Sequence, residues 1–275
     1  MLAPLAALAL SLSPVAAQTF AGVPDLAGQL SGLRFTRAPD AAAASVPGKA
    51  VAPAETPDTS PFAVKGIDVS NWQGLIDWPT VAKAGASFAY LKATESTDFV
   101  DEQFARNWAE AKKAGVLRGA YHFWDFCSSG AAQAAHFIKT VPNDGAALPM
   151  TIDLEESRDC RAMPSKEKFQ KSLDAFLAKV EKAYGLKPVL YVNLSIYEQY
   201  LAGADHGLKI WIADPHDKAP KLPAGVNWAM WQYSWKGRIA GINDSEVDLD
   251  VFNGTPEQLA ALTRPDGGGV MFASR

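Results

Sequence analysis

Residues 148–155 read LPMTIDLE, a short apolar run in which the last three positions carry two acidic side chains. Side chains two positions apart on a strand share a face, so Asp153 and Glu155 point the same way and Leu154 points the other way. Acidic side chains in an apolar strand are costly to bury without a role. The stretch therefore predicts a buried strand that ends in paired carboxyl groups.

Similar apolar runs recur on both sides of this stretch. They occupy residues 66–70, 87–92, 119–124, 188–193, 209–213, 229–233 and 247–252. Together with residues 148–155 they predict eight strands. Helical patterns lie between the early ones, and the alternation of strands with helices favours a parallel α/β architecture.

Two helices are predicted in detail. An apolar stripe at helical spacing predicts one over residues 104–111, closed by Gly115. A longer stripe predicts another over residues 169–184, with Ser165 as its N-cap and Gly185 as its stop.

The eight strands predict a barrel in the α/β class. The predicted folded unit, residues 64–263, is short for a barrel with eight helices. The connections after Ala213 and Tyr233 also lack helical stripes. We therefore expect an irregular single-domain (β/α) barrel with helices missing toward its C-terminal end.

The segments outside the predicted barrel have compositions typical of a cleaved signal peptide and of disordered chain. Residues 1–17 form an Ala/Leu-rich run that ends in small residues, which predicts a signal peptide. Residues 18–63 are predicted to be a flexible Ala/Pro-rich N-terminal segment and linker, and residues 264–275 a disordered tail.

Composition excludes several classes of protein. The net charge is −4 and the pI about 5.6, so a nucleic-acid binder with a basic face is not expected. No apolar run reaches the length of a membrane span. Two cysteines are too few for a disulfide-dense scaffold.

Acidic residues also lie in the first and last predicted strands. Asp68 lies in the first, and Asp248 and Asp250 lie in the last. The carboxyl ends of barrel strands carry the active site, so these acids could converge there with Asp153 and Glu155. Clustered carboxyl groups can divide into a proton donor and an ionised partner, as cleavage of a glycosidic bond requires. The alternative is that they cap loops or bind a structural cation.

Aromatic residues at the strand ends fit a sugar site, because their rings stack on the apolar faces of sugars. Packing inside the barrel would explain about half of them equally well. The residues predicted to bind substrate are Tyr121, Tyr191, Trp211, Trp231 and Gln232.

Seven short motifs occur in the order of a known family. They are GIDVS (66–70), KATE (92–95), GAYHF (119–123), DLE (153–155), WIA (211–213), WQY (231–233) and VDLDVFNG (247–254). These motifs resemble the glycoside hydrolase family 25 lysozymes, the Chalaropsis-type N-acetylmuramidases, over nearly the whole folded unit. The chain departs from the family at Ser96, where glycine is common, and in the stretches 127–130 and 157–164.

The resemblance implies an irregular β/α barrel that hydrolyses the β-1,4 bond from N-acetylmuramic acid to N-acetylglucosamine in peptidoglycan. It implies that Glu155 is the general acid and that Asp153 stabilises the transition state or orients the acetamido group. Asp68 and Asp248 match two further acids of the pocket. Help from the 2-acetamido group is favoured over a covalent intermediate, because two acids on one strand flank a bond poorly from opposite faces.

The two cysteines are predicted to form a disulfide. Cys127 follows the third strand and Cys160 the fourth, and adjacent strands bring their loops together. A signal peptide would place the chain in an oxidising compartment.

The four histidines lack the spacing of a zinc-binding pair, so no metal or cofactor is expected. His122 would either line the pocket floor or be a hydrogen-bonded core residue. His136, on a helix face, is expected to be structural.

The predicted protein is a secreted or periplasmic monomer that acts on peptidoglycan glycan strands. Two alternatives remain: a glycan-binding module without turnover, and a hydrolase of another amino-sugar polymer such as chitin.

Overall fold

The computed structural model describes residues 57–156, 160–215, 219–222, 226–243 and 246–265. The expected signal peptide, most of the expected linker, residues 157–159, His216 and the tail beyond residue 265 lie outside the described part of the chain.

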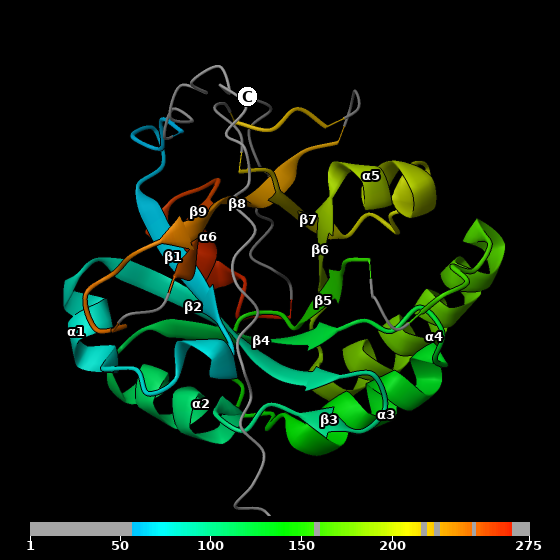
Figure 1. The fold of residues 1–275 in the computed structure, drawn as a ribbon, viewed down its shortest axis with the longest axis horizontal. Coiled ribbons are helices and arrows are strands. Elements are labelled where there is room, and N and C mark those ends of the chain that lie inside the picture. Colours follow the sequence, from blue (N-terminus) through cyan, green and yellow to red (C-terminus); the bar gives the residue numbers. More distant parts are fainter. Residues whose placement is uncertain (1–56, 157–159, 216–218, 223–225, 244–245, 266–275) are drawn as a thin grey trace, which may run out of the picture. The chain divides into compact units, whose positions relative to one another are not determined.

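Nine strands form one sheet, and all eight predicted strands are confirmed (Figure 1). Their bounds are β1 Val64–Val69, β2 Ala86–Glu95, β3 Phe99–Val100, β4 Leu117–Phe123, β5 Thr151–Leu154, β6 Val189–Asn193, β7 Lys209–Ala213, β8 Trp228–Gly237 and β9 Val247–Phe252. The sheet runs in the order β1-β9-β8-β7-β6-β5-β4-β2-β3, and β1 also pairs with β2, which closes the barrel. The additional strand, β3, is a short antiparallel partner of β2.

The barrel is parallel except at β9. All neighbours from β1 through β2 and β4 to β8 pair in parallel, whereas β9 is antiparallel to both β8 and β1. The expectation of a parallel sheet is therefore wrong for this strand. The link from Gly237 to Val247 is too short for the crossover that a parallel strand needs.

Helices cover one part of the barrel. Their bounds are η2 Asn71–Gln73, α1 Trp78–Lys83, α2 Phe104–Lys113, α3 Gly130–Thr140, α4 Lys166–Tyr184, α5 Leu194–Ile196, η3 Tyr197–Leu201 and α6 Pro256–Ala261. Figure 1 shows α1 to α4 along the side of β2, β4 and β5. No described residue between β7 and β8, or between β8 and β9, is helical, which confirms the helices missing near the C-terminal end. Among the described helices, none is long and apolar enough to cross a membrane.

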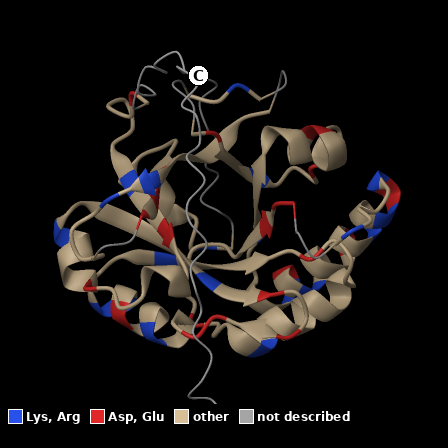
Figure 2. Cartoon of the chain, viewed as in Figure 1, with Lys and Arg blue, Asp and Glu red and all other residues tan. Residues whose placement is uncertain are grey.

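The two predicted helices begin and end as expected. The Ser165 hydroxyl accepts the backbone N–H of Lys168 at the start of α4, and Gly185 ends that helix with φ of 72°. Gly115, with φ of 80°, follows α2. These positions suit the two residues, because a short hydroxyl caps a helix start and glycine adopts positive φ without strain. Charged residues of both signs are interspersed along α2 and α4 (Figure 2).

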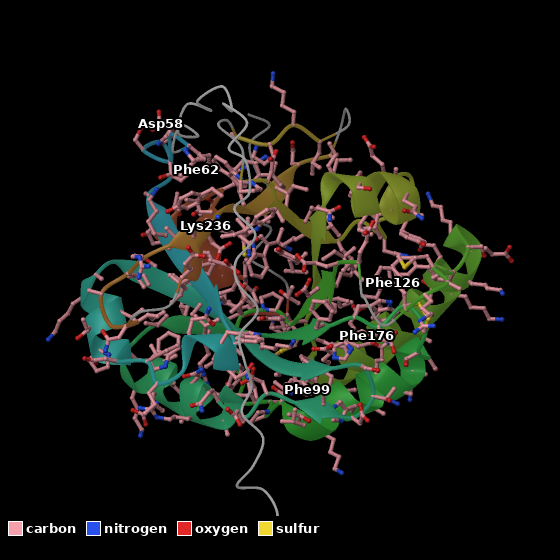
Figure 3. All side chains as sticks on the ribbon, viewed as in Figure 1. Asp58, Phe62, Phe99, Phe126, Phe176 and Lys236 are labelled. Carbon is pink, nitrogen blue, oxygen red and sulfur yellow. A yellow bond between two sulfur atoms is a disulfide. The ribbon has the colours of Figure 1, made fainter. Side chains whose placement is uncertain are left out.

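Aromatic side chains fill both layers of the core. Phe126 and Phe176 lie in the outer layer, between barrel and helices (Figure 3). Inside the barrel, Tyr90 and Trp211 pack with their ring centroids 4.9 Å apart. Tyr90 needs a glycine opposite it, because a Cβ on Gly119 would lie 2.2 Å from its ring.

The last residues of the expected linker pack on the barrel. Phe62 is buried, and its ring centroid lies 5.4 Å from that of Trp228 (Figure 3). The Lys65 ammonium also donates a hydrogen bond to the Thr59 carbonyl at 2.6 Å. Residues 57–63 therefore belong to the folded structure.

Candidate active site

A pocket of about 300 Å³ opens where the parallel strands end. All four predicted acids line it: Asp68, Asp153, Glu155 and Asp248. Four of the five predicted substrate-binding residues also line it: Tyr121, Tyr191, Trp211 and Gln232. The remaining lining residues are Val69, Ser70, Trp72, Gln73, Lys92 and Phe123.

Strand direction brings the acids together. Asp68 lies near the carboxyl end of β1, and Asp153 and Glu155 lie at that end of β5. Asp248 lies near the start of β9, but because β9 runs the opposite way, its start lies at the same edge of the barrel. There Asp248 is the register partner of Asp68.

Trp231 lies outside the pocket. It is fully buried in the outer core, where its indole N–H donates to the Asp214 carbonyl at 2.7 Å. Neighbouring residues on a strand point to opposite faces, so Trp231 and Gln232 cannot both point into the barrel. The prediction that Trp231 contacts substrate is accordingly withdrawn.

Hydrogen bonds link the acids through Tyr191 and Gln232. The Tyr191 hydroxyl lies 2.9 Å from Glu155 Oε1 and 2.8 Å from Gln232 Oε1. Gln232 Nε2 donates to Asp68 Oδ2 at 2.7 Å. The negative charge of the nearby, buried Asp250 also acts on Asp68 and raises the pKa of Asp68.

Asp250 is a buried acid that the sequence placed with the converging acids but not among the predicted catalytic residues. The Trp211 indole N–H donates to its Oδ1 at 2.9 Å, and its side chain is fully buried. Burial and the nearby Asp248 charge raise the pKa of Asp250 well above its usual range. The signal in the sequence was its alternation with Asp248 on one strand, which places both side chains on one face.

Burial raises the pKa of each predicted acid. The pKa of Asp153 is raised well above its usual range by burial and then by Glu155 and Asp68. Burial also raises the pKa of Glu155, although the Tyr191 hydrogen bond and the Lys92 charge oppose this. Burial and the Asp68 charge raise the pKa of Asp248 to about 9. The raised pKa values favour protonated carboxyl groups in the pocket near neutral pH, as general-acid chemistry requires.

The pKa of Asp68 is raised for two main reasons. Burial is the larger, and the neighbouring Asp250 charge adds to it. The hydrogen bond from Gln232 acts in the opposite direction. Burial of Asp68 therefore favours its neutral form, which still accepts the hydrogen bond from Gln232.

Lys92 supplies the positive charge among the lining residues. Its ammonium lies 2.6 Å from Glu95 Oε2 and 4.8 Å from the centre of the Phe123 ring. In the sequence, Lys92 belongs to the KATE motif and was not among the predicted site residues. A stronger signal was available, since it is the one lysine within the otherwise largely apolar strand β2.

One oxygen of Asp153 is available to a ligand. Asp153 Oδ1 is buried and has no hydrogen-bond partner among the described residues. A buried carboxylate oxygen without a partner is costly, so it indicates a group that arrives with the substrate.

Trp72 forms part of the pocket mouth. Its side chain is 81% exposed, and it lies in η2, which a capping box between Ser70 and Gln73 holds in place. The Asn71 backbone N–H also donates to Asp101 at 2.8 Å. The ring is therefore presented to solvent by an anchored turn.

His122 is a core residue and does not line the pocket. It is fully buried, with Nδ1 2.7 Å from the Thr94 hydroxyl and Nε2 2.9 Å from Gln133 Oε1. Burial lowers the pKa of His122 to about 4. His136 lies on α3, with Nε2 2.8 Å from the Phe99 carbonyl, which fits the structural role expected for it.

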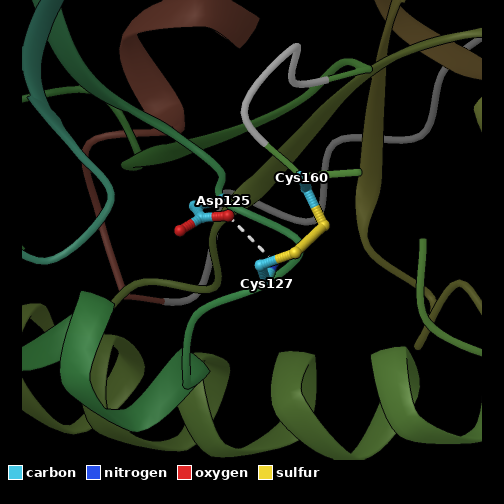
Figure 4. A group of neighbouring side chains, drawn as sticks. All are labelled: Asp125, Cys127 and Cys160. Atoms are coloured by element: carbon cyan, nitrogen blue, oxygen red, sulfur yellow. Dashed lines mark hydrogen bonds between the residues drawn. A yellow bond between two sulfur atoms is a disulfide. The ribbon is translucent and has the colours of Figure 1, made fainter. Parts of the chain in front are cut away.

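The predicted disulfide between Cys127 and Cys160 is present (Figure 4). The Cys127 backbone N–H donates to Asp125 Oδ1 at 2.8 Å. Asp125 and the two sulfur atoms lie within 4.8 Å of one another, but disulfide sulfur is not the thiolate that binds metals. The bond joins the loop after β4 to the segment that follows Glu155.

Comparisons with known proteins agree with the geometry. Residues 67–242 match the family model "Glycosyl hydrolases family 25". Lysozyme M1 of Streptomyces globisporus is 35% identical over 266 residues, 84% of this chain and 90% of that protein.

Two solved structures are similar to this one. A family 25 glycosyl hydrolase from Bacillus anthracis is 37% identical, with a TM-score of 0.70 over 74% of this chain and 95% of its own. The bacterial lysozyme from Streptomyces coelicolor is 37% identical, with a TM-score of 0.69 over 75% of this chain and 98% of its own. Both similarities extend over most of the barrel.

Proposed function

Because this chain belongs to the glycosyl hydrolases family 25, we propose that it cleaves the β-1,4 bond between N-acetylmuramic acid and N-acetylglucosamine in peptidoglycan. The observation that carries this proposal is the convergence of Asp68, Asp153, Glu155 and Asp248, from three strands, in one pocket. The similarity to lysozyme M1 supports peptidoglycan as the substrate.

Glu155 is the proposed general acid. Burial raises its pKa, so it holds a proton in the range where the bond must be cleaved. Its proton passes to the glycosidic oxygen as the bond to C1 breaks. Glu155 is then a carboxylate, which takes a proton from the water that completes hydrolysis.

Asp153 is the proposed partner of the substrate's acetamido group. Its unpartnered Oδ1 would accept the acetamido N–H, which orients the acetamido carbonyl oxygen toward C1. That oxygen attacks C1 as the leaving group departs and forms a cyclic oxazolinium, which water then opens. A negative Asp153 stabilises the positive charge that develops on this ring.

Substrate binding also decides which acid of the pair carries the proton. Without substrate, the deeper burial of Asp153 favours its protonated form. An N–H donated to Asp153 stabilises its carboxylate, and the proton is then favoured on Glu155. Binding of the correct sugar would therefore place the proton on Glu155, the general acid.

The other lining residues bind and position the glycan. Asp68 and Asp248 are proposed to donate hydrogen bonds as neutral carboxyl groups, because burial raises both pKa values. Tyr121, Tyr191 and Trp211 line the pocket with aromatic side chains, which suit a sugar.

We further propose that the chain acts as a monomer outside the cytoplasm. The disulfide fits an oxidising compartment, and so does the signal peptide expected from the sequence.

Digestion of purified peptidoglycan, followed by mass spectrometry of the products, tests the proposal. Fragments ending in reducing N-acetylmuramic acid are expected from the wild-type protein and should be absent with Glu155→Gln. Glu156→Gln is the matched control, since Glu156 is exposed beside it and should keep activity. Binding without new reducing ends would favour the binding module, and cleavage of chitin oligomers alone would favour a different glycan.

A further inference from the structure

Trp235 contacts the series of hydrogen-bonded side chains that runs from Gln232 through Tyr191 to Glu155. It is half exposed, and its indole N–H donates to Gln232 Oε1 at 2.7 Å. Gln232 itself is 1% exposed, so water has little access to its side-chain amide. The pairing of β8 with β9 shifts register between Gln232 and Ser234, which allows Trp235 to reach a residue three positions away.

The indole determines the orientation of the Gln232 amide. A tryptophan N–H can only donate, so the amide atom that faces it must be the oxygen. Nε2 then faces Asp68 and donates to its Oδ2 at 2.7 Å. The other orientation would place two donors against each other at Trp235.

The orientation of this amide decides where the Tyr191 proton goes. Tyr191 has one proton and lies near two acceptors, Gln232 Oε1 at 2.8 Å and Glu155 Oε1 at 2.9 Å. When Glu155 carries its proton, it can donate to the Tyr191 oxygen while Tyr191 donates to Gln232. Every contact is then satisfied in the neutral form of Glu155, whereas a Tyr191 that donates to Glu155 instead lowers the pKa of Glu155.

We propose that Trp235 is a positioning residue, which holds the Gln232 oxygen toward Tyr191 and thereby keeps Glu155 in its proton-donating form. This inference rests on the proposed function of Glu155 as general acid. Trp235 does not touch the reacting atoms in this scheme. It acts through Gln232 and Tyr191.

Loss of the indole N–H would release the amide. Gln232 could then turn, so that its oxygen accepts from neutral Asp68 and its NH₂ group donates to Tyr191. Tyr191 would be left to donate to Glu155, which favours the carboxylate of Glu155. The pKa of Glu155 should therefore fall.

Other charged and titratable groups also face Glu155 and act on its titration. They are Asp68 from β1, Lys92 from β2, Asp153 from β5, Tyr191 from β6 and Asp248 from β9. Asp153 lies two positions away on the same face of the strand, and Glu155 raises its pKa, so the test is made with Asp153→Asn present throughout.

The test is a ¹³C NMR titration of Glu155 in protein labelled at glutamate side chains. Glu155→Gln identifies the resonance by its disappearance. Trp235→Phe keeps an aromatic ring but removes the N–H, and should lower the Glu155 pKa by about 0.5–1 unit. Trp72→Phe, at the pocket mouth, is the matched control and should leave this pKa unchanged.

A double-mutant cycle shows whether the effect passes through the amide. Gln232→Met removes the amide at similar size, and in that background Trp235→Phe should cause no further shift. An unchanged Glu155 pKa in Trp235→Phe overturns the inference, and so does an equal shift in the Gln232→Met background. Circular dichroism confirms that each variant folds.

The titration requires no substrate, so its outcome does not depend on whether the protein cleaves peptidoglycan. With Asp153 restored, Trp235→Phe should also move the basic limb of the kcat/KM profile to lower pH. If the wild-type protein digests no peptidoglycan while the titration shift is present, the proposed function fails and the positioning of Glu155 by Trp235 remains.

Discussion

Asp68 on β1 and Asp248 on β9 are register partners across an antiparallel strand pair, although they come from the first and last strands of the barrel. This pairing places two carboxyl groups side by side. The Asp68 charge raises the pKa of Asp248, and the Asp248 charge raises the pKa of Asp250. A parallel β9 would put Asp248 at the far end of the barrel. The reversal of one strand therefore completes the candidate site.

Asp153→Asn should lower kcat by about 10²–10³-fold. The asparagine oxygen can still accept the acetamido N–H, but it carries no charge to stabilise the oxazolinium. Release of reducing ends from peptidoglycan measures the effect, and sedimentation with insoluble wall measures binding, which should persist. Asp174→Asn, exposed on α4, is the control. Full activity in Asp153→Asn would remove Asp153 from the mechanism.

Trp72→Ala should raise KM several-fold with little change in kcat. The ring lies at the pocket mouth, where it would stack on a sugar that takes no part in bond cleavage. Steady-state kinetics on soluble glycan strands measure both constants. Leu75→Ala removes a similarly exposed apolar side chain outside the pocket and should leave KM unchanged. A fall in kcat alone would contradict a role in binding.

Asp248→Asn should stabilise the fold at alkaline pH. Burial raises the pKa of Asp248 to about 9, whereas an unfolded aspartate titrates near ~3.9. Between these values the unfolded chain has lost a proton that the folded protein retains. The contribution of Asp248 to the free energy of unfolding is therefore greatest below about pH 4, and it falls as the pH rises toward 9.

Urea unfolding at pH 5 and pH 8 measures this effect. The variant should gain about 0.5–2 kcal/mol at pH 8, as is common when a functional charge is removed, and less at pH 5. Its activity should fall at the same time. Equal stability of variant and wild type at both values would show that Asp248 is not held protonated.

Replacing both Cys127 and Cys160 by serine should destabilise the protein. The bond closes a loop with a sequence separation of 33, for which chain entropy predicts about 3–4 kcal/mol as an upper value. Urea unfolding of the double variant, and of wild type with and without reductant, measures the loss. Alkylation of both cysteines without prior reduction would show that the disulfide does not form in the isolated protein.

Local patterns in the sequence predicted eight of the nine described strands and the helices α2 and α4. The stripe over α4 and its end residues, Ser165 and Gly185, depend on contacts within a few positions along the chain. The shared face of Asp153 and Glu155 follows from strand alternation in the same way. Alternation also argued against placing both Trp231 and Gln232 in the pocket, a conflict that the structure resolves in favour of Gln232.

The sequence by itself determined where the strands lie, which helices are missing and which acids can share a face, because these properties depend on short-range periodicity. Only the tertiary structure decided the direction of β9, the electrostatic interaction of Asp68 with the buried Asp250, and the contact of Trp235 with Gln232. Each of these depends on strand pairing between distant parts of the chain or on a local register shift. Such pairings are selected by the closure of the whole barrel. Strand periodicity does not encode them, although the short link from Gly237 to Val247 limits how β9 can pair.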